Sequence, residues 1–150
     1  MKIAEGKSSP YHLETIENPT KAQIDPFGLR LREYNFSKVG VYKREEFAVC
    51  AYLSDGTLIG GMYGYLVWGW MYLDIAWVDE ALRHHGIGTL LLSACEKYAV
   101  EHGIRNFRTN TGSFQSPSFY KKNGYEIFAQ LPVKGPDGSD HIDYFMKKQI

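Results

Sequence analysis

The residues whose types and spacing most clearly suggest a chemical role form a short turn of small and basic side chains at positions 83–88. The turn satisfies the pattern R-x-x-G-x-G through Arg83, Gly86 and Gly88. An apolar helix is expected to start beside it, so backbone N–H groups without helical partners converge at the positive end of the helix dipole. Because Gly86 and Gly88 have no side chain, an anion can approach the backbone closely, and Arg83 adds a charged hydrogen-bond donor. The turn therefore indicates an anion site, suited to phosphate.

Other phosphate and catalytic patterns are not met. The P-loop pattern GxxxxGK[ST] is absent, and Leu91 stands where the dinucleotide fingerprint GxGxxG needs its third glycine. No HxxxH or Cys–His spacing indicates a metal, so we expect none. Ser113 and Ser116 lack a partnered His and Asp at any recognisable spacing, which argues against a serine nucleophile.

A strongly patterned helix must position the turn. Apolar residues recur from Ile87 at i, i+3, i+4, i+7, i+8, i+11 and i+12, and Gly103 is suited to end the helix at about His102. A strand is expected before the turn at 70–78. A hairpin precedes that strand, with arms at 47–53 and 57–67.

The remaining pattern completes a mixed α/β sheet rather than a regular βαβ series. After the long helix we expect a strand at 104–109, then a short helix opened by Ser116 and Pro117 and stopped at Asn123–Gly124. Residues 125–130 and 141–146 alternate as a final antiparallel pair. At the other end of the chain we expect a strand at 11–16, and a helix capped by Asp25 and Pro26 that runs to about Tyr34.

Composition limits the class of protein. Lys plus Arg equals Asp plus Glu at 17 each, which argues against nucleic-acid binding through a broad basic surface. Cys50 and Cys95 are expected to be buried thiols of a reducing compartment. Residues 1–17 lack the apolar core of a secretory signal. The uncharged stretch 56–73 is rich in glycine and aromatics, which favours two buried strands over a membrane span.

At this point two longer stretches resemble a known family. "LDIAWVDEALRHHGIGTLLLSACEKYAVEHGIRNFRTNT" resembles the central motif of the GNAT superfamily of acetyl-CoA-dependent N-acetyltransferases, and "SFQSPSFYKKNGYEIF" resembles the motif that follows it, especially in small bacterial members. The likeness covers roughly residues 47–130. It implies one acetyltransferase domain over residues 1–150, with a mostly antiparallel sheet splayed at the strand that holds the coenzyme.

The resemblance also implies which residues bind acetyl-CoA. The pyrophosphate would lie on the turn and the start of its helix, and the pantetheine arm would lie between the strands 70–78 and 104–109. Asn110 and Ser116 could hydrogen-bond the arm, although turn and capping roles are alternatives for them. Many members carry glycine where this chain has His84, and a positive φ there would cost histidine more than glycine. The implied coenzyme residues are Ala76, Trp77, Val78, Arg83, His84, His85, Gly86, Ile87, Gly88, Thr89, Asn110 and Ser116.

Acetyl transfer to an amine needs a base and an acid. An alkylamine has a pKa of about 10.4, and the leaving thiol one of about 8.5. A backbone N–H of the splayed strand would face the oxyanion.

The resemblance puts Tyr120 at the coenzyme sulfur as general acid. The alternative is that Tyr120 is only a core aromatic of a short helix. Asp74 is our candidate base, with a salt-bridged or strand-end carboxylate as the equal alternative. Glu80 is a weaker candidate, and His84 and His85 would lie too far from the acetyl group.

The acceptor remains open at this stage. Several aromatics cluster before the coenzyme strand, where they could cage a cationic amine or, as we favour, form sheet core or a dimer surface. We expect a cytoplasmic enzyme that can form a homodimer and acts directly on a small primary amine. We expect neither a membrane nor a nucleic acid as its partner. A protein N-terminal or lysine acetyltransferase and a non-catalytic acyl-CoA-binding module are the alternatives. The clustered aromatics are Tyr63, Tyr65, Trp68, Trp70 and Tyr72.

Overall fold

A computed structural model describes residues 10–150 of the chain. The chain divides into two compact units, 1–41 and 42–150, which are described separately. The expected absence of a secretory signal falls partly on residues outside the described range. Among the described residues, no helix has the length and apolar character needed to cross a membrane.

The described part of the first unit, residues 10–41, contains one helix, α1 (Lys21–Val39), and two expectations for this region are wrong. Residues 11–16 form no strand, since no other segment within residues 10–150 pairs with them. The helix begins before Asp25 because the backbone N–H of Thr20 donates to Gln23 Oε1 at 2.9 Å. Asp25 instead pairs with Lys21 one turn away, and Pro26 lies inside the helix.

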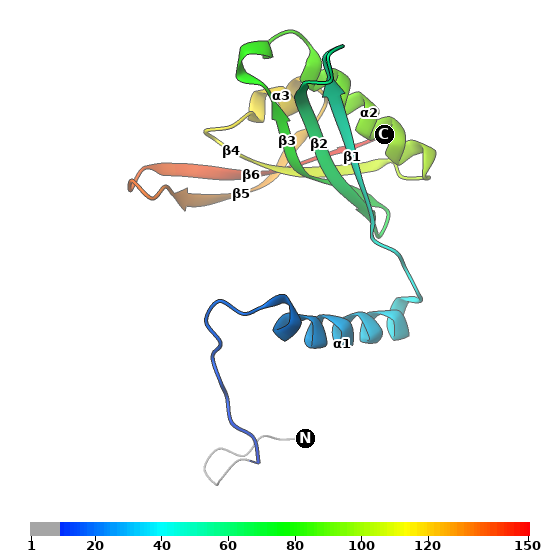
Figure 1. The fold of residues 1–150 in the computed structure, drawn as a ribbon, viewed down its shortest axis with the longest axis vertical. Helices are drawn as coiled ribbons and strands as arrows, with labels where there is room; N and C mark the ends of the chain where they lie inside the picture. The colour runs from blue at the N-terminus through cyan, green and yellow to red at the C-terminus, as the bar shows by residue number, and fades with distance from the viewer. Residues whose placement is uncertain (1–9) are drawn as a thin grey trace. The chain divides into compact units, whose positions relative to one another are not determined.

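The second unit is built on a six-stranded sheet in the order β1-β2-β3-β4-β6-β5 (Figure 1). Only β3 and β4 run parallel; every other neighbouring pair is antiparallel. The expected mixed α/β architecture is confirmed. The strands are β1 (Glu45–Tyr52), β2 (Leu58–Val67), β3 (Trp70–Val78), β4 (Asn106–Gly112), β5 (Glu126–Lys134) and β6 (Asp140–Gln149), and the helices are α2 (Ile87–Glu101) and α3 (Pro117–Lys122).

Local sequence explains the connections. The β1–β2 turn uses Gly56 at φ 87°, and Asp55 accepts a hydrogen bond from the Thr57 N–H. Trp68 and Gly69 both have positive φ, as a tight hairpin turn requires. The uncharged stretch is therefore two strands, as expected. Strand β4 lies two to three residues later than expected, at both its start and its end.

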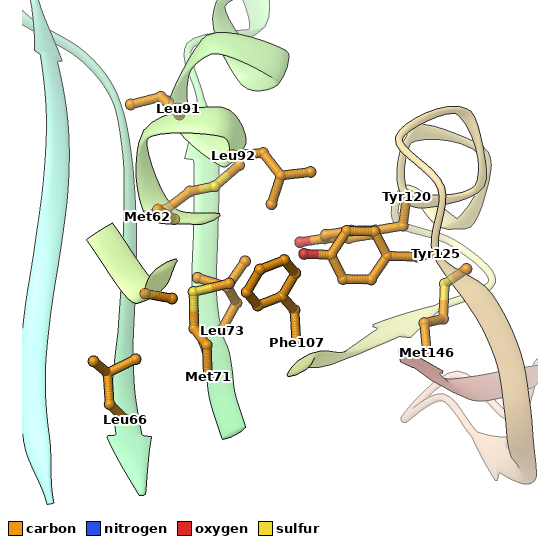
Figure 2. Packing of buried hydrophobic residues seen from close by; sticks show 12 residues of the cluster. Met62, Leu66, Met71, Leu73, Leu91, Leu92, Phe107, Tyr120, Tyr125 and Met146 are labelled. Atoms are coloured by element: carbon orange, nitrogen blue, oxygen red, sulfur yellow. The ribbon is translucent and has the colours of Figure 1, made fainter. Parts of the chain in front are cut away.

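The core lies on one face of the sheet, where α2 packs across β1, β2 and β3 (Figure 2). Cys95 of α2 is completely buried, as expected. Cys50 is exposed, so that expectation was wrong: β1 alternates, and Cys50 shares the outward parity of Glu46 and Ala48. Both thiols are free. The largest fully buried side chains are Phe107, Met71, Leu73, Leu92, Met146 and Cys95.

Candidate active site

Strands β3 and β4 pair over a short stretch and then separate. Their last paired residues are Leu73 and Thr109, although β3 continues to Val78 and β4 to Gly112. The Thr109 hydroxyl donates to the Leu73 carbonyl at 3.0 Å, which pins the sheet at that point. We call this position the fork. Beyond it, residues 74–77 of β3 are exposed, so the opened edge of the strand is accessible.

Asp74 lies at the fork as the extra residue of a β-bulge. Tyr63 pairs with Ile75 and Gly64 with Leu73, which leaves Asp74 without a partner in β2. Gly64 is required opposite the bulge because a Cβ there would collide with the Tyr72 carbonyl. Asp74 is exposed, and among the described residues it forms no salt bridge. The salt-bridged alternative therefore does not apply.

The backbone of β3 beyond the fork offers groups to the open side. The Val78 carbonyl points there, since it accepts a hydrogen bond from Arg83 rather than from β2. Strand alternation directs the N–H and C=O of Ala76 to the same side. Trp77, which pairs with Gly61, directs its main-chain N–H and C=O toward β2. Of the three predicted residues, Ala76 and Val78 are thus placed to bond an extended ligand through the main chain.

The turn at 83–88 has the conformation of an anion cradle. Gly86 caps α2 with φ 82°. His84, which stands where many family members carry glycine, has φ 64°, so the backbone at this position is left-handed. Within the described part of the chain, no carbonyl or side chain accepts from the N–H groups of residues 84–89. These donors include those of Ile87 and Thr89, at the positive end of a 15-residue helix.

Side chains around the turn hold its shape. Arg83 Nε donates to the Val78 carbonyl at 3.1 Å, which ties the turn to the end of β3. His85 Nδ1 donates to the Arg83 carbonyl at 2.8 Å, because a carbonyl can only accept. The space above Gly86 is open, whereas a Cβ on Gly88 would lie 3.1 Å from the Phe119 ring. Gly88 is therefore explained by packing against α3.

Tyr120 lies in α3 and is 5% exposed. Burial raises the pKa of its phenol, and the nearby Thr109 side chain partly offsets that rise. Thr109 is the residue that pins the fork, so the Tyr120 phenol lies close to the point where β3 and β4 part. The phenol is thus neutral near neutral pH and can donate a proton there.

Asn110 follows Thr109 in β4, and Ser116 precedes α3. Asn110 Nδ2 donates to Asp143 Oδ2 at 3.4 Å. Ser116 is the N-cap residue of α3, yet its hydroxyl makes no capping bond; its N–H donates to Thr111 Oγ1 at 3.3 Å. The capping alternative for the Ser116 side chain is therefore wrong.

The clustered aromatics lie on the sheet face opposite α2. Arg44 lies over Tyr65 and Arg108 over Tyr72, at 3.6 and 4.6 Å from the ring centroids. Tyr63 donates to Glu46 at 2.7 Å. The protein's own cations thus occupy the faces of two rings that an amine cage would need. Trp68 is exposed and the other four aromatics are half-buried, so the cluster is not sheet core.

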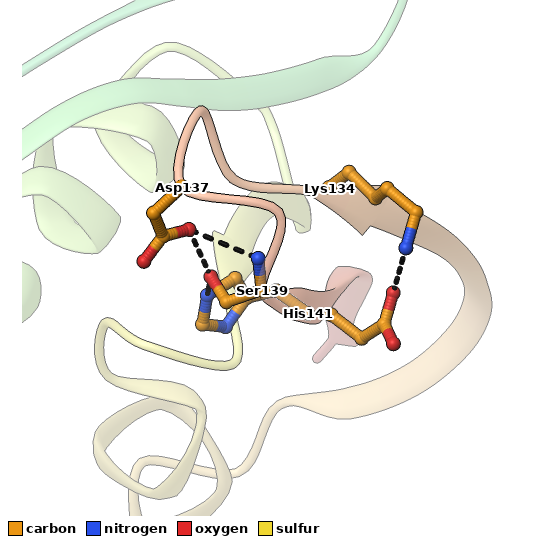
Figure 3. Close-up of polar contacts among 5 residues, drawn as sticks. Lys134, Asp137, Ser139 and His141 are labelled. Carbon is orange, nitrogen blue, oxygen red and sulfur yellow. Dashed lines mark hydrogen bonds and ion pairs between the residues drawn. The ribbon is translucent and has the colours of Figure 1, made fainter.

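Sequence reasoning missed two features of this region. Thr109 carried no signal because its role depends on Leu73, distant in sequence. The second is a polar chain from the β5–β6 loop to the start of β6 (Figure 3): Ser139 donates to Asp137 at 2.6 Å and lies 2.7 Å from His141 Nε2. Since the serine has one proton and the carboxylate only accepts, His141 must donate through Nε2. Among the described residues, no cluster of His, Cys, Asp and Glu could hold a metal.

Comparisons with known proteins agree with this geometry. Residues 10–125 match the acetyltransferase (GNAT) family. The blasticidin-S acetyltransferase of Streptomyces morookaense is 34% identical over 99 residues, which cover 65% of this chain and 73% of that protein.

Two solved structures share the fold. A crystal structure of an acetyltransferase from Bacillus cereus is 31% identical, covers 91% of this chain and 98% of its own, and has a TM-score of 0.77. A putative streptothricin acetyltransferase from Bacillus anthracis, crystallised with acetyl coenzyme A, has a TM-score of 0.63 at 21% identity, covering 73% of this chain and 65% of its own.

Proposed function

Because the chain belongs to the acetyltransferase (GNAT) family, we propose that it transfers acetyl from acetyl-CoA to a primary amine of a small molecule, by direct attack in a ternary complex. The observation that carries this proposal is the fork, since the buried Tyr120 phenol lies near Thr109 there and the open edge of β3 leads from it to the cradle at 83–88. A thioester at the fork and a diphosphate on the cradle would belong to one extended ligand.

The residues fit acetyl-CoA in three places. The N–H groups of 84–89 and the Arg83 guanidinium would hold the pyrophosphate. The main-chain groups of Ala76 and the N–H of Val78 would bond the pantetheine arm, with Asn110 of β4 and Ser116 at the start of α3 beside it. Of the remaining predicted contacts, Trp77 and His85 would act through their side chains.

The chemistry then divides between two residues. Asp74, in its bulge at the fork, would take the proton of the attacking amine, directly or through water, and Tyr120 would give one to the departing thiolate. A backbone N–H on the open side of β3 would face the oxyanion. The carboxylate is exposed, so an acceptor approaching from solvent can reach it.

A small acceptor is favoured by the blasticidin-S acetyltransferase, the named relative with 34% identity. The experiment is an amine panel assayed by release of free thiol from acetyl-CoA, including nucleoside and peptidyl antibiotics, polyamines, amino acids and peptides. Turnover with a small amine supports the proposal. Turnover with peptides alone would indicate a protein acetyltransferase, and silence across the panel a binding module.

The proposal extends to the whole chain and its setting. One acetyltransferase domain is supported by the family match, which runs from residue 10 across the boundary at 41 to residue 125. A cytoplasmic location is consistent with two free thiols. A homodimer would pair through the late strands, where the edge strand β5 exposes Phe128 and Leu131. The zero net charge suits neither nucleic acid nor an anionic membrane surface as a partner.

A further inference from the structure

A second buried tyrosine lies against Tyr120. The rings of Tyr120 and Tyr125 have centroids 5.5 Å apart at 68°, and the Tyr125 N–H donates to the Tyr120 carbonyl at 3.0 Å. Figure 2 shows the two phenol oxygens on the same side of this pair. Tyr125 is 3% exposed, so water does not solvate its hydroxyl freely.

The proton of Tyr125 is already committed. Its hydroxyl donates to Glu96 Oε1 of α2 at 3.0 Å. Lys148 of β6 donates to both oxygens of the same carboxylate, at 3.1 and 2.9 Å, in a largely buried ion pair. A phenol has one proton, and an ionised carboxylate accepts only. Tyr125 can therefore offer Tyr120 oxygen lone pairs but no hydrogen bond.

We propose that Glu96 is a positioning residue: by fixing the direction in which Tyr125 donates, it keeps Tyr120 in its proton-donating form. This inference rests on the proposed role of Tyr120 as general acid. With the Tyr125 proton turned away, the group left to stabilise a Tyr120 phenolate is the Thr109 hydroxyl, whose own proton lies on the Leu73 carbonyl and would have to turn from it. In the reaction, the Tyr120 O–H bond breaks as the S–H bond forms, and the phenolate later regains the proton that the amine loses.

The groups around Tyr120 mostly raise the pKa of its phenol, which favours the protonated form. Burial and the Cys95 thiol both raise its pKa, and only Thr109 lowers it. Burial also raises the pKa of Tyr125, and Glu96, Tyr120 and Cys95 raise it further. The polar and titratable groups around the pair are thus Cys95 and Glu96 from α2, Thr109 from β4 and Lys148 from β6.

The test is a direct titration of Tyr120 that needs no turnover. Protein carrying ¹³Cζ-tyrosine is followed by NMR from pH 7 to 12, and Tyr120→Phe identifies the signal. Glu96→Gln frees the Tyr125 proton to face Tyr120, so the Tyr120 midpoint should fall by about one pH unit. Glu101→Gln, an exposed glutamate on the same helix, should leave it unchanged.

Two further variants separate positioning from packing. In a Tyr125→Phe background, Glu96→Gln should move the Tyr120 midpoint no further, because the link is gone. Lys148→Met leaves the Glu96 charge uncompensated, so the midpoint should rise, whereas a loosened core would lower it. An unchanged midpoint in Glu96→Gln, an equal fall in both backgrounds, or a fall in Lys148→Met would each overturn the inference.

Kinetics then separate this inference from the proposed function. The alkaline limb of kcat should follow the Tyr120 midpoint in each variant, while KM for acetyl-CoA changes less than about twofold. If the titrations behave as expected but Tyr120→Phe keeps full turnover, the acid assignment fails and the Glu96 coupling stands. If Glu96→Gln does not fold, Lys148→Met alone decides by the sign of its shift.

Discussion

The Thr109 hydroxyl donates to the Leu73 carbonyl at 3.0 Å, at the last position where β3 and β4 pair. This bond marks where a parallel ladder becomes an open edge, and the same side chain lowers the pKa of the nearby Tyr120 phenol. A single buried side chain therefore connects the separation of the strands with the proposed acid.

Thr109→Val should be destabilising and should slow turnover. Valine has the shape of threonine but removes the side-chain hydrogen bond to the Leu73 carbonyl, at a cost of about 0.5–1.5 kcal/mol in unfolding free energy. Urea unfolding and kcat check this. Thr111→Val, two residues along the same buried face, should also lose stability but should keep kcat, because Thr111 contacts Ser116 rather than Tyr120. Equal loss of kcat in both variants would separate Thr109 from catalysis.

Much of this arrangement follows from local sequence. Helix α2 and its glycine turn were predictable because period and cap lie within 20 residues, and the hairpins because Gly56 and Gly69 supply positive φ. The fork could be expected only through the family resemblance. The bulge at Asp74 depends on Gly64 of another strand, and Gly88 is explained by Phe119, 31 positions later. The start of α1 was mispredicted because Asp25–Pro26 resembles a cap more closely than Thr20–Gln23 does.

Gly86→Glu should abolish binding of acetyl-CoA. The substitution places a carboxylate where the cradle presents its N–H groups, and it forces a side chain onto a φ of 82°. Calorimetry should show at least a ~100-fold loss of affinity. Gly56→Glu is the matched control: it has the same charge, a φ of 87° and open space, but lies in the β1–β2 turn. Equal losses in both variants would remove the cradle from coenzyme binding.

His84→Gly should stabilise the protein. His84 holds φ 64°, where an L-residue is strained by roughly 1–2 kcal/mol, and part of the gain is offset by the entropy of glycine in the unfolded chain. We expect a net rise of about 0.5–1 kcal/mol in urea unfolding, with acetyl-CoA affinity nearly unchanged. His85→Gly should lose stability, since His85 Nδ1 bonds the Arg83 carbonyl. A destabilised His84→Gly would mean that the histidine side chain contributes more than its strain costs.

Tyr120→Phe should lower kcat by about 10²–10⁴ and leave acetyl-CoA affinity nearly intact, because phenylalanine keeps the ring but removes the proton donor. The assay must be run where chemistry limits turnover. Tyr98→Phe is a useful control, since its ring stacks on Phe47 at 4.6 Å, away from the fork. Wild-type kcat in Tyr120→Phe would move the acid role to another group.

Stability should fall as the pH rises above about 9, and Cys95 should account for part of that fall. Burial raises the pKa of its thiol from 9.0 to about 12. A group whose pKa is higher folded than unfolded contributes stability that is complete below the unfolded value and is lost as the pH rises through the folded one. The window is therefore pH 9–12. Burial raises the pKa of Tyr120 and Tyr125 too, which extends the fall in stability above pH 10.

Urea unfolding at several pH values should show a shallower dependence of stability on pH between pH 9 and 12 for Cys95→Ala, although the variant is less stable throughout because of its cavity. Cys50→Ala, at an exposed position, should keep the wild-type slope. Parallel slopes in wild type and Cys95→Ala would show that the thiol is already solvated in the folded protein.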